Sequence, residues 1–345
     1  MEDPLAQNVS YLIGKGRFCL LKEGRMNMKP FKTLDEQIAL LESRGLTIPD
    51  HDKAKHYLLQ YSYYNVINVY SRFFQIDTDR YIDGTTFDEI RAVHVFDSEI
   101  KSVFFKYLLE CEKHLKSIVS YRFSEAYPDV PYAYLHTTSY DDHNLLNLST
   151  TVSQLSKIIS QNIKNKKPNA IKHYSNNHQN VPIWVLINQL TFGQVVYMYT
   201  HFDNKLRNAI ARDVTHYLEN NTGKKIILEP IELERLLFNL LDLRNCVAHN
   251  NMLFNFKSKN NVKYIPEIHE KNGIEKKSPR QDPFNCFLMM QGLIEKEQYA
   301  LFSNTIRKRI RNLNNKLVSV PVEAITSSLG FPSSWYRKAP LEQPK

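Results

Sequence analysis

Between Phe87 and Ala126 the chain repeats apolar side chains at helical spacing, and this stretch constrains the fold most strongly. Thr85 or Thr86 can cap the start of a long helix. The apolar stripe consists of Val95, Phe96, Ile100, Val103, Phe104, Tyr107, Leu108, Cys111, Leu115, Ile118 and Val119. A break is expected near the charged residue Asp97, and prolines after Ala126 end the pattern.

Glycine is scarce, with 10 residues in 345, which argues against a fold built on tight turns or glycine-rich phosphate loops. The hydrophobic content of 42% and charged content of 23% are those of an ordinary globular protein. The predicted fold is therefore all-α, a bundle of many helices.

The net charge of +9 favours polyanionic partners, nucleic acid first, although many proteins with such an excess bind no nucleic acid. The four cysteines fall in no paired-ligand spacing, which predicts free thiols in a reducing compartment, without a metal or other cofactor. The start of the chain is acidic, and no apolar run approaches 18 residues. A cytoplasmic protein without a membrane partner is expected. The motifs H-E-x-x-H, G-x-S-x-G and Walker A are also missing from the sequence.

Capping signals mark further helices. Thr33 with Glu36 forms a capping box, Gly45 ends that helix, and Asp50 or Asp52 caps the next one. An aromatic cluster follows, made of Tyr61, Tyr63, Tyr64, Tyr70, Phe73 and Phe74. Two uses of this cluster are open, which are core packing and the stacking of RNA bases.

The second half of the chain alternates helical and polar segments. Asn144 to Lys164 is predicted to be a helix capped by Asp141 or Asp142, and Asp203 is expected to cap another helix. Residues 255–283 read as an exposed polar insertion with a hairpin around 262–265. Helix resumes from Phe284 to Leu317. Its basic residues, Arg307, Lys308, Arg309, Arg311 and Lys316, fit either a solvated face or a track for the RNA backbone.

A helix beginning near Glu229 and Pro230 leads into Leu241-Asp-Leu-Arg-Asn-Cys-Val-Ala-His-Asn250. Leu237, Leu241 and Ala248 share one face, which we expect to be buried. Asn245 falls on the same face, and a buried amide needs a hydrogen-bond partner. His249, one turn further along, is the natural partner.

Arg244 and His249 permit two interpretations. The two side chains point about 140° apart around a helix, but arginine is long enough to swing toward the imidazole. A fixed positive charge beside a group that titrates near pH 6.5 suits a phosphodiester undergoing reaction. Alternatively, both residues only interact with the helix dipole and the last carbonyl groups.

Arg244-Asn245-x-x-x-His249 resembles the R-x(4–6)-H motif of HEPN ribonucleases. Further segments are similar to the AbiD/AbiF-type abortive-infection proteins of bacteria, in the order of that family and across roughly residues 29–341. They are residues 29–46, Tyr63-Tyr-Asn65, Gly84-Thr-Thr-Phe87, Val181-Pro-Ile-Trp-Val-Leu-Ile187, Thr191-Phe-Gly193 and Leu329-Gly-Phe-Pro-Ser-Ser-Trp335.

The resemblance implies a metal-independent RNA endonuclease of phage defence, in which the 2′-hydroxyl of the RNA attacks the adjacent phosphate. It implies that His249 transfers protons, Arg244 holds the phosphate and Asn245 orients His249 or the substrate. One histidine does not easily serve both sides of the reaction, so a composite site in a homodimer is implied. Asn250 stands where the family often has a second histidine. We expect RNA to be contacted by Asn250 and by the basic residues Arg307, Lys308, Arg309 and Arg311.

The same surface also suits a second class of function, a non-cleaving RNA-binding HEPN module that holds a small regulatory RNA. The expected organisation divides the chain into five parts. These are a basic arm (1–28), an N-terminal helical region (29–135), a connecting region (136–181), a HEPN-like helical domain (182–320) and a tail (321–345).

Overall fold

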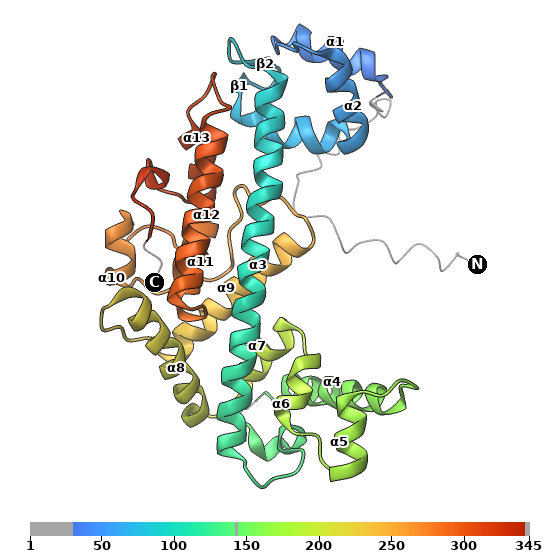
Figure 1. Ribbon diagram of the computed structural model, residues 1–345, viewed down its shortest axis with the longest axis vertical. Helices are drawn as coiled ribbons and strands as arrows, with labels where there is room; N and C mark the ends of the chain where they lie inside the picture. Colours follow the sequence, from blue (N-terminus) through green and yellow to red (C-terminus); the bar gives the residue numbers. More distant parts are fainter. Residues whose placement is uncertain (1–29, 142–143, 342–345) are drawn as a thin grey trace, which may run out of the picture.

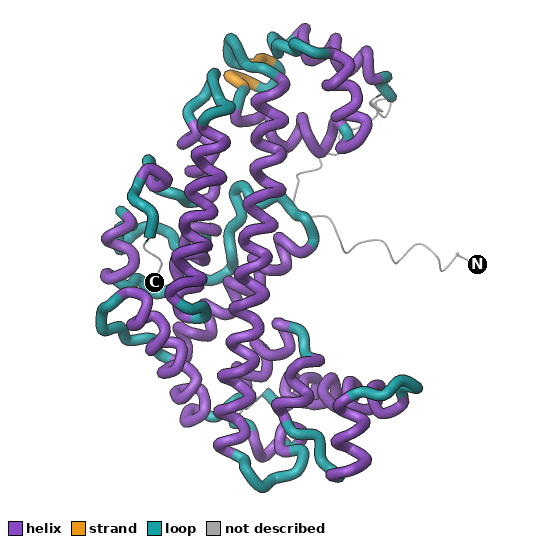
Figure 2. The backbone as a smooth tube through the Cα atoms, viewed as in Figure 1, coloured by secondary structure: helices purple, strands orange, loops and turns teal. Residues whose placement is uncertain are grey.

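The computed structural model describes residues 30–141 and 144–341 (Figure 1). The α-helices are α1 (Leu34–Ser43), α2 (His51–Tyr61), α3 (Phe87–Ala126), α4 (Leu145–Lys164), α5 (Ala170–His178), α6 (Ile183–Leu186), α7 (Phe192–His201), α8 (Asn204–Thr222), α9 (Pro230–Ala248), α10 (Pro266–His269), α11 (Pro283–Met289), α12 (Lys296–Asn314) and α13 (Val322–Thr326). The two short strands β1 (Gln75–Asp77) and β2 (Arg80–Tyr81) pair antiparallel. Figure 2 shows how small this sheet is beside the helices, so the all-α prediction is confirmed. The predicted arm, Cys19 and Asp142 lie outside the described residues.

The long helix α3 runs the length of the molecule, with α1 and α2 at one end and α4 to α6 at the other (Figure 1). It packs against α6, α8, α9 and α12. Ile100, Phe104 and Leu115 are among its fully buried residues, and the apolar core continues from them across the described bundle. Because α3 contacts both α9 and α12, it is the element against which the motif helix is placed.

The expected break near Asp97 is wrong, because α3 is continuous over 40 residues. Asp97 is buried, but it accepts hydrogen bonds from Tyr70 Oη and pairs with Lys101 Nζ, each at 2.8 Å. These two partners stabilise the charge inside the helix, and the stretch contains neither glycine nor proline.

Most helix starts are confirmed where a side chain caps the backbone. Thr33 and Thr86 form capping boxes, and Asp50 and Asp203 accept from the backbone of the first turn. The N-cap of α4 is Asn144, and Asp141 does not cap it. Gly45 has a φ of +88°, the left-handed conformation expected after a helix end.

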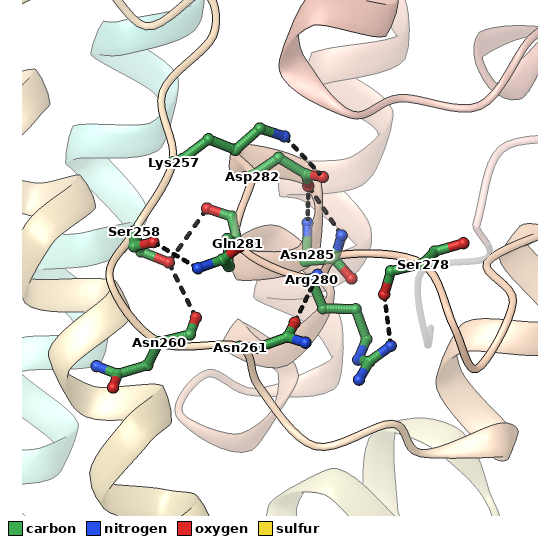
Figure 3. A network of polar contacts seen from close by, with 9 residues as sticks. All are labelled: Lys257, Ser258, Asn260, Asn261, Ser278, Arg280, Gln281, Asp282 and Asn285. Carbon is green, nitrogen blue, oxygen red and sulfur yellow. Dashed lines mark hydrogen bonds and ion pairs between the residues drawn. The ribbon is translucent and has the colours of Figure 1, made fainter.

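The polar segment after α9 is not an exposed insertion. Residues 261–265 form no strand, so the hairpin prediction is wrong, and Val262, Ile265 and Ile268 are buried. A polar network joins the two ends of the segment to each other (Figure 3). Ser258 N–H donates to Gln281 O at 2.8 Å, and Arg280 N–H donates to Asn261 Oδ1 at 2.7 Å. The polar composition thus supplies internal hydrogen bonds rather than solvation alone.

The aromatic cluster is buried only in part, and RNA stacking by its exposed members stays a prediction. Tyr70 and Phe74 are buried in the core, as the packing interpretation predicts. Tyr61 and Tyr64 are exposed. Cys111, Cys246 and Cys286 are buried free thiols.

Candidate functional site

The motif helix α9 buries a different face from the one expected. Its core face consists of Leu233, Leu236, Leu237, Leu240, Leu243 and Val247. Leu241 and Asn245 are half-buried and Ala248 is exposed, so the predicted stripe through these residues is wrong. The sequence offers two apolar stripes, and the neighbours α3, α7, α8 and α11 decide between them.

The outer face of α9 lines an open groove of about 720 Å³. Leu241, Asp242, Arg244 and Asn245 form one wall of this groove. The facing residues come from the start of α7 (Thr191, Phe192, Gly193 and Tyr197) and from the segment after α9 (Lys259 and Asn260). A second open groove of about 760 Å³ shares Tyr197, Ile231, Glu234 and Phe238 with the first. The two grooves are therefore adjoining parts of one channel along α9.

Arg244 lies between this groove and α3. Its Nη1 donates to Asn245 Oδ1 at 3.4 Å, and its Nε is 3.9 Å from Glu112 Oε2. Glu112 also accepts a hydrogen bond of 2.8 Å from Lys116 Nζ. Neither Arg244 Nε nor Glu112 Oε2 has a hydrogen-bond partner among the described residues. The guanidinium is thus placed beside a carboxylate but is not hydrogen-bonded to it, which leaves donors for an anion in the groove.

His249 is the C-cap of α9 and is exposed. Its backbone N–H donates to Asn245 O at 3.1 Å. Within the described ranges its imidazole forms no hydrogen bond, and the expected side-chain bond to Asn245 is missing. The helix ends at Ala248, so His249 leaves the helical path and Asn245 contacts Arg244 instead. Arg244 and Asn245 are brought together, and the imidazole lies free at the end of the same helix.

Asn250 follows in the left-handed region with a φ of +54°. Its side-chain Oδ1 accepts a hydrogen bond of 2.7 Å from Lys101 Nζ of α3. The predicted RNA contact of Asn250 would therefore have to use the remaining amide group.

The basic residues of α12 do not form one continuous exposed track. Arg307 is 4% exposed, lies over the Trp335 ring and donates to Ala339 O. Arg309 pairs with Glu99 at 3.2 Å. Lys308 is exposed, and so is Arg311, although its Nη1 donates to Tyr336 O at 3.3 Å. Lys316 is exposed as well.

Two carboxylate–lysine pairs of α3 were not predicted to belong to the site. Asp97 with Lys101 and Glu112 with Lys116 each pair four residues apart along the helix, at 2.8 Å. The available signal was the repeated spacing of opposite charges inside an apolar stripe, since a charge in a buried face needs a partner.

No group of three or more His, Cys, Asp or Glu side chains is placed to hold a metal ion across residues 30–141 and 144–341. No helix in these ranges is both long and apolar enough to cross a membrane.

A family model described as "Abi-like protein" matches residues 56–255. The chain belongs to the Abi-like protein family. The match begins in α2 and ends after Asn250, so it contains α3, the groove residues except Lys259 and Asn260, and the whole Arg244–His249 motif. Comparison with curated proteins and with solved structures gives no match. Membership of the Abi-like family supports a role in phage abortive infection, which the sequence resemblance predicted.

Proposed function

We propose that this Abi-like protein is a HEPN-type RNA endonuclease of the AbiD/AbiF kind, and that it cleaves RNA during phage defence without a metal ion. The observation that carries the proposal is that Arg244 lines an open groove while His249, at the end of the same helix, has an exposed imidazole without a hydrogen-bond partner among the described residues. A side chain held in place but without a strong partner is available to a substrate.

The chemistry assigns one task to each residue. A 2′-hydroxyl of the RNA loses its proton to His249, and its oxygen bonds to the adjacent phosphorus. The bond from phosphorus to the 5′-oxygen breaks, and that oxygen takes a proton from an acid on the other side. Arg244 stabilises the charge that develops on the phosphate oxygens, and Asn245 orients the guanidinium through the contact at 3.4 Å.

The acid is proposed to come from a second copy of the chain, whose α9 faces the first. Apolar side chains beside the motif support this arrangement. Tyr197 is 52% and Ile231 is 44% exposed, and both line the channel along α9. Exposed apolar groups at one place are typical of a surface that another protein covers.

RNA is attracted by the overall positive charge, to which Lys308 and Arg311 contribute from the exposed side of α12. The Arg307 guanidinium is already held in the bundle, so its expected contribution is structural.

The decisive experiment incubates the purified protein with labelled cellular RNA in EDTA. We expect cleavage that leaves cyclic phosphates, and we expect His249→Ala and Arg244→Ala each to lower the rate by about 100-fold or more. Arg212→Ala and His216→Ala, two exposed residues of α8, are matched controls that should retain the wild-type rate.

Sedimentation should give a dimer at concentrations where cleavage occurs. Cleavage that requires an added metal ion would contradict the mechanism, and so would full activity of His249→Ala. RNA binding without any cleavage would instead favour a module that holds a small regulatory RNA.

A further inference from the structure

The chain reverses direction immediately after His249 through two backbone hydrogen bonds. Asn251 N–H donates to Cys246 O at 2.9 Å, and Asn250 N–H donates to Val247 O at 3.2 Å. This is the Schellman pattern of helix ends, which places the residue after the C-cap in the left-handed conformation. Asn250 has that conformation, with a φ of +54°. Glycine usually occupies such a position, so an asparagine there calls for a reason.

The side chain of Asn250 supplies one, because it connects the turn to a buried ion pair. Its Oδ1 accepts from Lys101 Nζ at 2.7 Å, and the same Nζ lies 2.8 Å from Asp97 Oδ2. Tyr70 Oη donates to that carboxylate at 2.8 Å. Lys101 is 8% and Asp97 is 1% exposed, so the ion pair is shielded from water, whereas Asn250 is exposed and its bond to Lys101 lies where the pair meets the surface.

A buried ion pair is weak evidence for stability, since apolar residues of similar size often stabilise a protein as well or better. The pair adds a directed contact to one side chain, that of the residue directly after His249. The charges of the pair also influence the pKa of the Cys246 thiol in the last turn of α9. Burial raises the pKa of this thiol to about 11, with Asp97 raising it further and Lys101 lowering it.

We propose that Asp97 and Lys101 are positioning residues that fix the His249 imidazole for proton transfer, by holding Asn250 through its side chain. The inference rests on the proposed function for its role in cleavage. The backbone turn sets the direction of the chain, and the Lys101–Asn250 bond removes the remaining freedom of the turn. A displacement of about 1 Å in a reacting group can reduce a rate by about 100-fold, so a small loosening here has a measurable effect.

Asn250→Gly separates this role from a purely structural one, because glycine keeps the left-handed turn and removes only the link to Lys101. We expect kcat to fall by about tenfold to 100-fold while KM stays within about twofold. Asn250→Asp retains an oxygen acceptor for Lys101 and tolerates the left-handed region, so most of the wild-type kcat should return.

A double-variant cycle tests the link itself. Lys101→Met with Asn250→Gly should lose no more activity than the worse single variant, since both remove one bond. Lys101→Met leaves Asp97 uncompensated, so Asp97→Asn/Lys101→Met replaces it if the single variant does not fold. Arg122→Met is the control, because Arg122 pairs with Asp213 at 2.7 Å, away from the motif.

NMR of the labelled His249 imidazole gives a readout that does not depend on cleavage. We expect its chemical shift or line width to change in Asn250→Gly and in the Lys101 variants, and to stay as in wild type in Arg122→Met. Unchanged His249 signals in Asn250→Gly, or a wild-type kcat in that variant, would overturn the positioning role. If the wild-type protein cleaves no RNA, the proposed function fails while the NMR comparison still decides this inference.

Discussion

The two halves of α3 hold the rest of the molecule in different ways. In the N-terminal half, Glu89, Asp97 and Lys101 make short contacts of 2.7 to 2.9 Å to the C-terminal segment, Tyr70 and the turn after the motif. In the C-terminal half, Glu112 reaches Arg244 only at 3.9 Å. At the motif, the first half therefore contributes short hydrogen bonds, while the second half contributes an ion pair at 3.9 Å, and its short pair of Arg122 with Asp213 at 2.7 Å lies away from the motif.

This difference suits two tasks within the proposed site, which are to fix the turn after His249 and to let Arg244 exchange its partner. In the proposed reaction, the turn that carries His249 has to stay in one geometry, because proton transfer depends on distance. In the same proposal, Arg244 has to leave its carboxylate for a phosphate, so a weak resting partner is an advantage. The same helix therefore holds Asn250, the residue after the motif, through a short hydrogen bond and holds Arg244 only loosely.

The largest expected effect is a loss of stability when the hydrogen bonds of Glu89, in the N-terminal half of α3, are weakened. Its two carboxylate oxygens accept from Val318, Ser319 and Thr86, and the residue is 2% exposed. Glu89→Gln presents an amide group to some of these donors. We expect a loss of about 3 kcal/mol in the free energy of unfolding, measured in urea at pH 7. Glu110→Gln, a substitution at a more exposed glutamate of α3, is the control and should leave the urea midpoint unchanged.

The pH dependence of this loss has a defined sign. Burial raises the pKa of Glu89, but hydrogen bonds from the Ser319, Val318 and Thr86 backbone outweigh it and hold the pKa below its usual value. A depressed carboxylate pKa contributes stability above the pKa of an unfolded glutamate, about 4.3, and that stability is lost as the pH falls below it. The difference between wild type and Glu89→Gln should therefore shrink between pH 5 and about pH 3. A constant difference over that range would contradict the assignment.

Much of the fold could be predicted because its signals are local. The caps at Thr33, Asp50 and Thr86 and the stripe of α3 act within a few residues of the chain. The break near Asp97 could not be excluded in the same way, because Tyr70 belongs to a distant segment. Residues 255–283 were predicted to be exposed since their hydrogen-bond partners, such as Asn261 for Arg280, are equally distant in sequence.

The candidate site was predicted in part for the same reason. Arg244, Asn245 and His249 form a sequence motif, so they could be named, but the face of α9 that is buried depends on packing. That choice moved Asn245 out of the core and into the groove. Asn239 is the buried amide of this helix instead, and no local pattern distinguishes it.

A smaller loss of stability should distinguish the two asparagines of α9, since Asn239 is fixed by hydrogen bonds and Asn245 faces the groove. Asn239 is fully buried, and its amide donates to Asn260 O at 2.8 Å and accepts from Asn260 N–H at 3.3 Å. Asn239→Ala should lower the free energy of unfolding by about 2 kcal/mol. Asn245→Ala should change it by less than about 0.5 kcal/mol and reduce cleavage instead. Equal losses of stability in urea unfolding would show that both residues are structural.

The smallest expected effect is a change in RNA affinity when Glu112, in the C-terminal half of α3, loses its charge. The carboxylate lowers the positive charge that Arg244 and Lys116 present to an anion in the groove. Removing one unit charge several ångströms from a phosphate at a hydrated surface is worth about 1 kcal/mol. Glu112→Gln should therefore bind RNA about fivefold more tightly, with little change in stability, because a glutamine oxygen can still accept the Lys116 hydrogen bond and the contact to Arg244 at 3.9 Å contributes little. Binding is measured in a His249→Ala background to prevent cleavage, with Glu110→Gln as the control. A firm contact would give the reverse result, in which Glu112→Gln unfolds more easily and RNA binds no better. That outcome would remove the distinction between the two halves of α3, since Arg244 would then be held as tightly as Asn250.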